Sequence, residues 1–402
     1  MSLLEHPTAQ ALLADAEISA ASVRGCSLRL NRFLQRYLPR FYRVEPRALA
    51  EVVVQGKLSK LERKTAGPIA YLAGLEREPV QHFVGAGLWD DEAVMTELRS
   101  HVAQQWADPD AVLVLDPSSF PKKGTASCGV ARQWCGRLGK VENCQVGVFA
   151  AYVTAAGYAP VDRQLYLPED WADDDARRQR THVPEEVTFE ERWRIALTLL
   201  ERVRQDLSFA WVAGDDEFGR ASAFRAELRW RRLRYILDVP CNTLIRDLRE
   251  APAPGRRRPP WRRVDEWLKA QPSSRWRKMA TGDGAKGPKV VWAVEAWVQT
   301  KDEDGSAGPR ERLVVKRTVD REPQVWYSLS NAPSEVPLDD AVVAHGRRHG
   351  IEEMLQAGKG EIGLGHYEVR SWVGWHHHMT LSFLALGFLV LEKGRLEKKR
   401  QR

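Results

Sequence analysis

The amino-acid sequence predicts an α/β protein in which helices flank a mixed β-sheet. Three features of the 402-residue chain indicate this fold class. Residues 111–239 alternate between apolar, strand-like runs and amphipathic helices, which is the pattern of a sheet covered by helices. Residues 1–105 carry apolar side chains at helical spacing, and residues 289–329 contain three more strand-like runs separated by turns. We therefore expect the sheet together with an N-terminal helical domain and a β-rich insertion.

The central strand of this sheet is predicted at residues 111–116, with the sequence AVLVLD. The apolar run is rich in Val and Leu and is followed by turn residues, as in a strand that is buried on both faces. It ends in Asp116, a carboxylate that is costly to bury unless it is paired, hydrogen-bonded or bound to a metal. On this stretch alone, the simpler interpretation is that Asp116 caps the following turn.

The elements after Asp116 follow a defined order. A hairpin is predicted from residues 145–154 and 161–167, followed by an amphipathic helix, a short strand over 209–213, another helix and a strand over 234–239. The short strand also ends next to an acid, Asp215. This order, with acids at strand ends, is that of an RNase H-like sheet. The spacer between the first strand and the hairpin is longer than this order requires.

The same pattern divides the chain into five regions. We expect an N-terminal helical, DNA-binding domain over residues 1–107, although a structural lid is equally compatible with its sequence. The RNase H-like core is expected over residues 108–239 and 339–392, and the β-rich insertion over residues 240–338 interrupts it. Residues 393–402 form a basic tail.

Charge and composition favour a polyanionic partner and argue against a membrane protein. The net charge is +7, and arginines cluster at residues 229–234 and 256–263, as in proteins that bind nucleic acids. A solvated basic surface is an equally good interpretation of any one cluster. No apolar run reaches the roughly 18 residues of a membrane span, no secretory signal is visible, and the five cysteines fit no zinc pattern. We expect a cytoplasmic protein with reduced thiols.

Three acids are candidates for one shared site: Asp116, Asp215 and Glu352, which lies in a helix predicted over residues 341–357. Cutting and joining phosphodiesters with two Mg²⁺ ions requires such a set, because hard cations bind oxygen ligands and shared carboxylates hold the two ions about 4 Å apart. The acids are distant in sequence, so only the fold can bring them together. The neighbouring acids that compete for these positions are Asp216, Glu353 and Glu361.

Several cations accompany these acids. Arg348, Glu352 and Lys359 have the spacing R-x3-E-x6-K, which puts the first two on one helical face and Lys359 two turns farther along it. A carboxylate flanked by two cations suits a metal site that receives a phosphate backbone, although a surface ion pair is the commoner meaning of this spacing. Lys122 and Lys123 lie in a predicted turn after the first strand and are candidates for DNA phosphate contacts or for a solvated turn.

Four long segments, in chain order, are LVLDPSSFPKKGTASCGVARQWCGRLGKVENCQVGVFAAYV, VAGDDEFGR, RYILDV and RRHGIEEMLQAGKGEIGLGHYEVRSWVGWHHHMTLSFLALGFL. They resemble the DDE superfamily endonucleases of bacterial insertion-sequence transposases, and the similarity extends over nearly the whole chain. In that family the first catalytic acid ends an LVLD-type strand, which matches Asp116. The second precedes a Tyr-Gly pair, here Phe218-Gly219, and matches Asp215. A Y-x2-R-x3-E-x6-K signature matches Arg348, Glu352 and Lys359, with His345 in the tyrosine position.

The resemblance implies a DNA transposase that cleaves element ends and transfers strands into target DNA. It also implies two Mg²⁺ ions, replaceable by Mn²⁺, on Asp116, Asp215 and Glu352, a double-stranded DNA partner, a homodimer on DNA, and a location at the bacterial nucleoid. The D-P-S-S sequence in place of the usual D-D/S-T-G leaves the acids intact. Two alternatives remain open: a catalytically inactive, domesticated DNA-binding protein, and a nuclease without joining activity.

Overall fold

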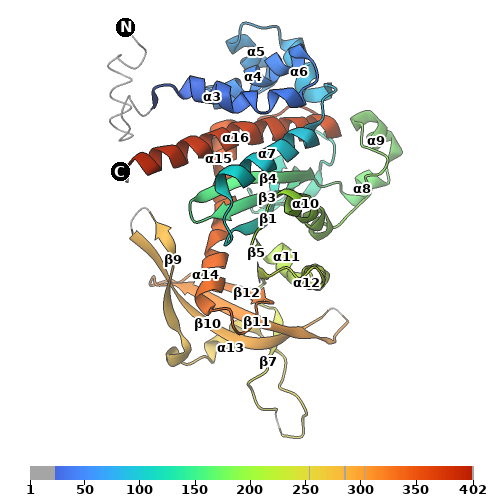
Figure 1. Ribbon diagram of the computed structural model, residues 1–402. Helices are drawn as coiled ribbons and strands as arrows, with labels where there is room; N and C mark the ends of the chain where they lie inside the picture. Colours follow the sequence, from blue (N-terminus) through green and yellow to red (C-terminus); the bar gives the residue numbers. More distant parts are fainter. Residues whose placement is uncertain (1–22, 253, 285–286, 303, 401–402) are drawn as a thin grey trace.

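The computed structural model describes residues 23–252, 254–284, 287–302 and 304–400. Residues 1–22 of the predicted N-terminal domain and residues 401–402 of the predicted basic tail lie outside this part. N-terminal helices form one end of the described molecule, a sheet with helices on its faces forms the middle, and a β-rich region forms the other end (Figure 1).

Five strands form the central part of the sheet: β1 (Val112–Pro121), β3 (Lys140–Thr154), β4 (Gly157–Leu165), β5 (Trp211–Gly214) and β6 (Tyr235–Asp238). Their order is β4-β3-β1-β5-β6. Strands β1, β5 and β6 are parallel, and β3 is antiparallel to both β1 and β4. This is the topology of an RNase H-like sheet, so the predicted fold class is confirmed.

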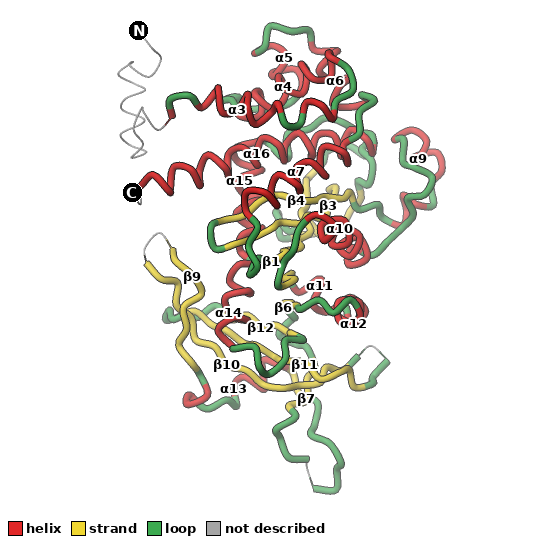
Figure 2. Tube along the Cα trace, in the orientation of Figure 1, coloured by secondary structure: helices red, strands yellow, loops and turns green. Residues whose placement is uncertain are grey.

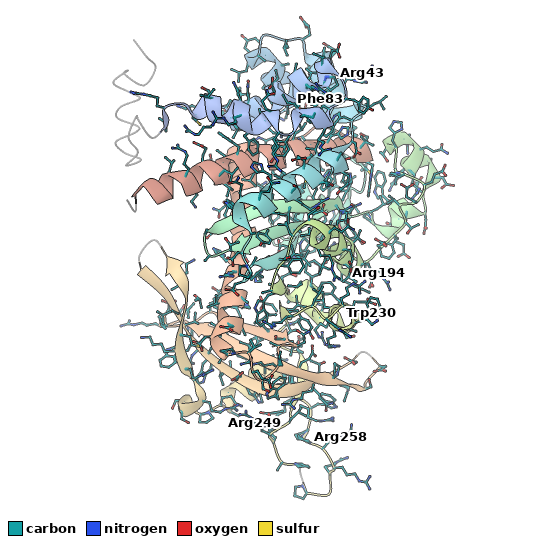
Figure 3. The ribbon with its side chains drawn as sticks, in the orientation of Figure 1. Arg43, Phe83, Arg194, Trp230, Arg249 and Arg258 are labelled. Carbon is teal, nitrogen blue, oxygen red and sulfur yellow. The ribbon has the colours of Figure 1, made fainter. Side chains whose placement is uncertain are left out.

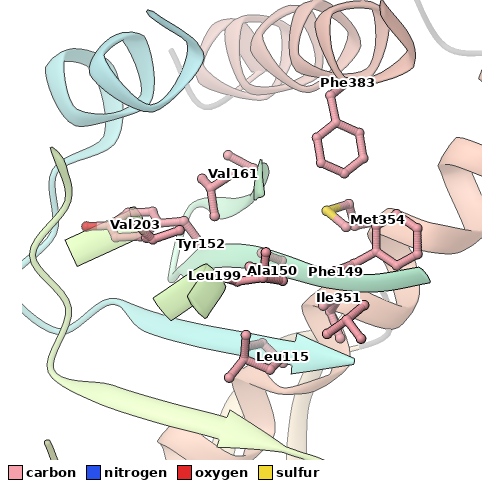
Figure 4. Close-up of a cluster of buried hydrophobic side chains, with 14 of the residues drawn as sticks. Leu115, Phe149, Ala150, Tyr152, Val161, Leu199, Val203, Ile351, Met354 and Phe383 are labelled. Atoms are coloured by element: carbon pink, nitrogen blue, oxygen red, sulfur yellow. The ribbon is translucent and has the colours of Figure 1, made fainter. Parts of the chain in front are cut away.

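Helices bury both faces of these strands, and residues 111–115 are therefore fully inaccessible to solvent. Successive side chains of a strand point to opposite faces. In β3, Phe149 contacts Phe383 of α16 (Trp372–Arg400) with ring centroids 6.2 Å apart. The next residue, Ala150, lies beside Leu199 of α10 (Arg192–Asp206), as Figure 4 shows. A strand enclosed in this way has to be apolar throughout, which explains the uninterrupted run before Asp116.

The long spacer between β1 and β3 adds an edge strand. It contains β2 (Ala131–Cys135), which pairs antiparallel with the first residues of β3 around a tight turn. Cys135 and Cys144 of this hairpin are buried, whereas the side chain of Trp134 is 58% exposed. The spacer is thus an elaboration of the sheet and not evidence against the predicted fold.

The β-rich insertion continues the same sheet (Figure 2). Strand β12 (Val325–Ser330) pairs antiparallel with β6, β11 (Ala307–Thr318) pairs with β12, and β10 (Gly287–Lys301) pairs with β11. The described sheet therefore has twelve strands. The other elements of the insertion are β7 (Leu244–Asp247), β8 (Arg262–Arg263), α13 (Val264–Lys269), η3 (Ser273–Arg275) and β9 (Arg277–Gly284).

The N-terminal helices pack on α16. They are α3 (Cys26–Gln35), η2 (Leu38–Arg40), α4 (Val44–Leu58), α5 (Ala66–Leu72), α6 (Arg77–Ala86) and α7 (Asp91–Trp106). Helix α4 ends at Leu58, and the hydroxyl of the next residue, Ser59, donates a hydrogen bond to the carbonyl of Gly56 at 2.6 Å. A buried aromatic cluster of Phe41, Phe83 and Trp89 joins these helices.

The remaining helices position the candidate site. The helix expected over residues 341–357 is two helices, α14 (Leu338–Arg347) and α15 (His349–Ala357), which meet at Arg348, and the π-helical turn η4 (Gly358–Ile362) follows. The others are α8 (Glu169–Ala172), α9 (Asp175–Thr181), α11 (Asp216–Arg220) and α12 (Ser222–Trp230). None of the described helices has the length and apolar character needed to cross a membrane.

Candidate active site

Three parallel strands carry an aspartate at the point where their pairing with one another stops: Asp116 within β1, Asp215 directly after β5 and Asp238 at the end of β6. Leu115 of β1 is paired with Gly214 of β5, and Gly214 is paired with Leu237 of β6. The carboxyl ends of parallel strands are the usual place for ligand sites in α/β sheets. The residues that follow these pairs, and therefore lie side by side, are Asp116, Asp215 and Asp238.

A cavity of ≈ 1040 Å³ opens at this edge. Asp116 and Asp215 line it together with Glu352 of α15 and Lys359 of η4. Four residues selected from the sequence thus line a single cavity. The wall also carries hydroxyl, cationic and aromatic groups: Ser118, Ser119, Trp134, Arg137, Arg192 and His366.

The carboxylates of Asp116 and Asp215 are short of positive charge. Among the residues that the structure describes, none donates a hydrogen bond to the carboxylate of Asp116 or forms an ion pair with it. Burial and the charge of Asp215 raise the pKa of Asp116 well above its ordinary value. The Oδ1 of Asp215 accepts a hydrogen bond from the backbone N–H of Glu217 at 3.1 Å. Even so, burial and the charges of Glu217 and Asp216 raise the pKa of Asp215 to about 7.

The third strand-end acid, Asp238, is fully paired. Its Oδ1 accepts hydrogen bonds from Ser328 at 2.7 Å and from the Nε2 of His345 at 2.6 Å, and its Oδ2 lies 3.2 Å from the Nε of Arg348. Burial alone would raise the pKa of Asp238, but His345, Arg348 and Ser328 lower it to about 2. Burial also lowers the pKa of His345, so the permanent cation of this network is Arg348. The sequence reasoning did not single out Asp238, although it ends an apolar run just as Asp116 does.

Glu352 lies in the first turn of α15, where Arg348 and His349 hold it. Its Oε1 is 2.7 Å from the Nη2 of Arg348, and its Oε2 is 2.8 Å from the Nδ1 of His349. Burial disfavours the charge on Arg348, but the carboxylates of Asp238 and Glu352 outweigh burial and raise its pKa. Arg348 does not line the cavity. It links the paired aspartate to the glutamate on the cavity wall.

The competing acids have different surroundings. Asp216 forms an ion pair with Arg220 at 2.7 Å, whereas Asp215 directly continues β5. Glu353 lies 3.6 Å from the Nε2 of His349, and neither Glu353 nor Glu361 lines the cavity. The cavity lining therefore favours Glu352 over Glu353 and Glu361. Asp216 lines the cavity beside Asp215, and its ion pair with Arg220 is what distinguishes it.

Lys359 brings a positive charge to the cavity wall. Its ammonium donates a hydrogen bond to the hydroxyl of Ser118 at 2.8 Å and lies 5.3 Å from the ring centroid of Phe120. Burial and the charge of Arg137 lower the pKa of Lys359, and Asp116 opposes this shift. An anionic substrate group next to Ser118 would meet this ammonium.

Carboxylates are suitable ligands for a divalent cation, but the acids of this cavity do not form a group of three around one point. Carboxylate oxygens are the ligands that Mg²⁺ prefers, and a cation would compensate the charges of Asp116 and Asp215. In the described part of the chain, no three His, Cys, Asp or Glu side chains lie close enough together to hold a metal ion. Glu352 is the acid that would complete such a group, and its two oxygens are engaged by Arg348 and His349.

Other residues considered from the sequence lie outside the cavity. Lys122 donates a hydrogen bond to the carbonyl of Tyr367 at 3.3 Å and lies 3.2 Å from the centroid of its ring, and Lys123 is exposed. Neither lysine lines the cavity. The rings of His376, His377 and His378 hydrogen-bond to three different backbone carbonyls, so they form no common site.

Two comparisons give similarities without assigning function. Over 193 residues the chain is 26% identical to the "Probable transposase for insertion sequence element IS701" of Microchaete diplosiphon, covering 47% of this chain and 48% of that protein. The match therefore spans about half the length of that relative. Among solved structures, the piggyBac transposase synaptic complex with hairpin DNA has 12% identity and a TM-score of 0.41, covering 88% of this chain and 66% of that one.

A family model described as DDE superfamily endonuclease matches residues 36–301. Members of this superfamily generally use divalent metal ions. The matched region includes Asp116 in β1 and Asp215 directly after β5, and it stops before Glu352. Because the match covers well over half of the chain and contains both unpaired strand-end acids, we conclude that this chain belongs to the DDE superfamily endonucleases.

Proposed function

We propose that the protein is a DNA transposase that cleaves the ends of a mobile element and joins them to target DNA. The observation that carries this proposal is the pair Asp116 and Asp215, two half-buried carboxylates that share a cavity wall and lack an ion-pair partner in the described structure. Such a pair is costly to keep unless a cation binds to it. The family membership and the similarity to a protein named as a probable transposase support the same conclusion.

The three acids would hold two Mg²⁺ ions, which supply an activated attacking oxygen and stabilise the leaving oxygen. Asp116 and Asp215 provide fixed ligands because β1 and β5 hold their backbones. Glu352 would join them when its carboxylate leaves Arg348 and His349. Lys359 would contact the phosphate near the scissile bond, since its ammonium lies on the cavity wall beside Ser118. We assign Arg348 the role of positioning Glu352 because it contacts that carboxylate from outside the cavity.

The DNA duplex would lie along basic surfaces of the molecule. The exposed residues Arg256, Arg257 and Arg258 lie in the loop between β7 and β8. Figure 3 shows Arg258 at the opposite end of the molecule from the N-terminal helices. Phosphate contacts of this kind supply affinity without sequence readout. We further propose that the N-terminal helices bind the element end and that two copies of the chain act together on DNA.

The test is cleavage of element-end DNA in Mg²⁺ by the purified protein and by Asp116→Asn, Asp215→Asn and Glu352→Gln variants. The element ends are obtained as inverted repeats that flank the reading frame. All three variants should lose cleavage, and Glu353→Gln should retain it because Glu353 does not line the cavity. Cleavage by the variants at the wild-type rate would refute the proposal. A pre-cut end separates joining from cutting, because a nuclease alone would not join it.

A further inference from the structure

A second large cavity lies between the N-terminal helices and the catalytic core. Its volume is ≈ 840 Å³, and its walls come from α4, α5 and α6 on one side and from residues 366–370 and α16 on the other. His366 lines both this cavity and the cavity that contains Asp116, Asp215 and Glu352, which we call the catalytic cavity. The two spaces are therefore neighbours that share a wall residue.

This second cavity has more cationic than anionic side chains. Its acids are Glu78 and Glu368, and Arg63 lies 3.8 Å from Glu368. Such an excess of positive charge in a concave, partly desolvated space attracts anions. The basic side chains on its wall are Lys57, Lys64, Arg77, His82, His366, Arg370 and His378.

Lys57 is the most unusual of these residues. Its side chain is 1% exposed, and the one hydrogen-bond partner of its ammonium in the described structure is the Nδ1 of His378, at 3.4 Å. His378 donates from its Nε2 to the carbonyl of Leu364, and burial lowers its pKa well below the ordinary value, so the ring is a neutral partner. Burial and the charge of Lys64 lower the pKa of Lys57 to about 7. A buried ammonium without a carboxylate destabilises the free protein.

The neighbouring lysines do not relieve this charge. Lys64 is 7% exposed and donates to two backbone carbonyls, those of Lys57 and Ser59. Lys122 packs on Tyr367, which lines the cavity, and burial lowers its pKa to about 7. Lys57 lies in the last turn of α4, where the helix end offers only a partial negative charge. Lys57 and Lys64 thus line this cavity without a carboxylate bound to either ammonium in the described structure.

We propose that this second cavity binds the phosphate backbone of a single DNA strand that continues from the catalytic cavity past His366, with Lys57 and Lys64 as its phosphate contacts. The inference rests on the proposed function, because it takes DNA as the substrate. A volume of ≈ 840 Å³ corresponds to a cube of roughly 9 Å. A B-DNA duplex is wider than its own major groove, which is already about 12 Å across, so a duplex does not fit inside this cavity. The occupant is therefore one strand and not a duplex.

The experiment measures DNA affinity without metal, so that no cleavage occurs. The full chain is titrated with an element-end duplex that carries a single-stranded tail on either strand at the cleavage site, and with a blunt duplex, at several salt concentrations. Lys57→Met should weaken binding of a tailed duplex about tenfold. It should also reduce the slope of log affinity against log salt by about 0.7, the contribution of one contact to a single strand. Binding of the blunt duplex should be unchanged.

Two further variants make the result specific. Lys57→Gln keeps a hydrogen-bond donor for His378 but has no charge. It should reduce the slope of log affinity against log salt by the same amount as Lys57→Met. Lys60→Met removes the same charge three residues away, at an exposed position outside the cavity, and should not distinguish tailed from blunt DNA. The melting temperature of Lys57→Met without DNA should be equal to or higher than that of the wild type, since the variant removes an uncompensated charge.

The inference would be overturned if Lys57→Met and the wild type had the same slope of log affinity against log salt on both tailed duplexes. So would a lowered melting temperature in both Lys57 variants, which would make the lysine a structural residue. Failure of the proposed function has a different signature. A protein that shows the tail-specific slope loss but never cleaves in Mg²⁺ supports this second cavity and contradicts the transposase assignment.

Discussion

Asp116 in β1 and Asp215 after β5 differ from Asp238 in β6 in their electrostatic surroundings. In each strand a buried apolar run leads to an aspartate, and the three aspartates follow residues that are paired across the sheet. Asp238 has a serine, a histidine and an arginine around it, and its pKa is lowered to about 2. Asp116 and Asp215 lack a cationic partner, and their pKa values are raised. Aspartates in the same sequence pattern thus have pKa values that are shifted in opposite directions.

The difference separates a carboxylate that stabilises the fold from a pair that is available for chemistry. A buried charge contributes to stability only when its partners compensate the loss of water. Asp238 meets this condition in the free protein. Asp116 and Asp215 would have such compensation only with a cation bound. Titratable groups in a cavity with strongly shifted pKa values indicate a functional site for this reason.

The largest expected effect is on activity. Asp116→Asn should reduce Mg²⁺-dependent cleavage on the order of 10³-fold, because a bound metal contributes several kcal/mol to transition-state stabilisation. The metal-free variant should unfold at the same temperature as the wild type or higher, since one of two mutually repelling carboxylates is removed. Cleavage rates and thermal melts of the same preparation test both statements. A strong loss of stability would erase the contrast with Asp238.

The second effect is on stability. Asp238→Asn should lower the free energy of unfolding by about 3 kcal/mol, because breaking one partner of a buried ion pair leaves the other uncompensated. The measurement is urea-induced unfolding followed by tryptophan fluorescence. Ser328→Ala, which removes one neutral hydrogen bond to the same carboxylate, should cost about 1 kcal/mol. An equal loss of unfolding free energy in the two variants would mean that the charge of Asp238 is not needed to compensate Arg348.

The third effect is a pH dependence of stability without metal. The pKa of Asp215 is about 7 in the folded protein and about 4 in an unfolded chain. The folded state therefore holds the proton more tightly, and the contribution of Asp215 to stability should be lost as pH rises from about 4 to about 7. Asp238 has the opposite sign, and its contribution should be lost as pH falls from about 4 towards 2. Unfolding midpoints in EDTA between pH 4 and 8 should fall less steeply in Asp215→Asn than in the wild type.

The smallest effect concerns His349. This side chain is 55% exposed and holds the Oε2 of Glu352 at 2.8 Å, and contacts between exposed charged groups contribute about 0.2–1 kcal/mol. His349→Ala should release Glu352 and lower the Mg²⁺ concentration for half-maximal cleavage by up to about fivefold. A metal titration of the cleavage rate measures this. A higher Mg²⁺ requirement would show that His349 helps to place the glutamate.

Much of this arrangement could be predicted from the sequence because its signals are local. The apolar runs that precede Asp116 and Asp215 indicated buried strands, and their order indicated the sheet. The role of Asp238 could not be predicted, because Ser328 and His345 come from positions 90 and 107 residues later. The ion pair between Arg348 and Glu352, by contrast, follows from their i,i+4 spacing, which is visible in the sequence.

Edge strands were also hard to predict. Strand β2 has the sequence ARQWC, which is neither a long apolar run nor a strict alternation, and its identity as a strand depends on pairing with β3. Buried lysines escaped notice for a similar reason. Lys57 lies near the end of an ordinary helix, and its burial follows only from the packing of α4 against α16.

The pairing of β12 with β6 has a mechanical consequence. Ser328, Leu329 and Ser330 are bonded through the backbone to the strand that carries Asp238, so the insertion cannot swing as a hinged lid without breaking part of the sheet. DNA held by the insertion would stay at a fixed distance from the acids on β1 and β5. In the proposed DNA complex, the continuous sheet would therefore fix which phosphate along the duplex reaches the catalytic cavity.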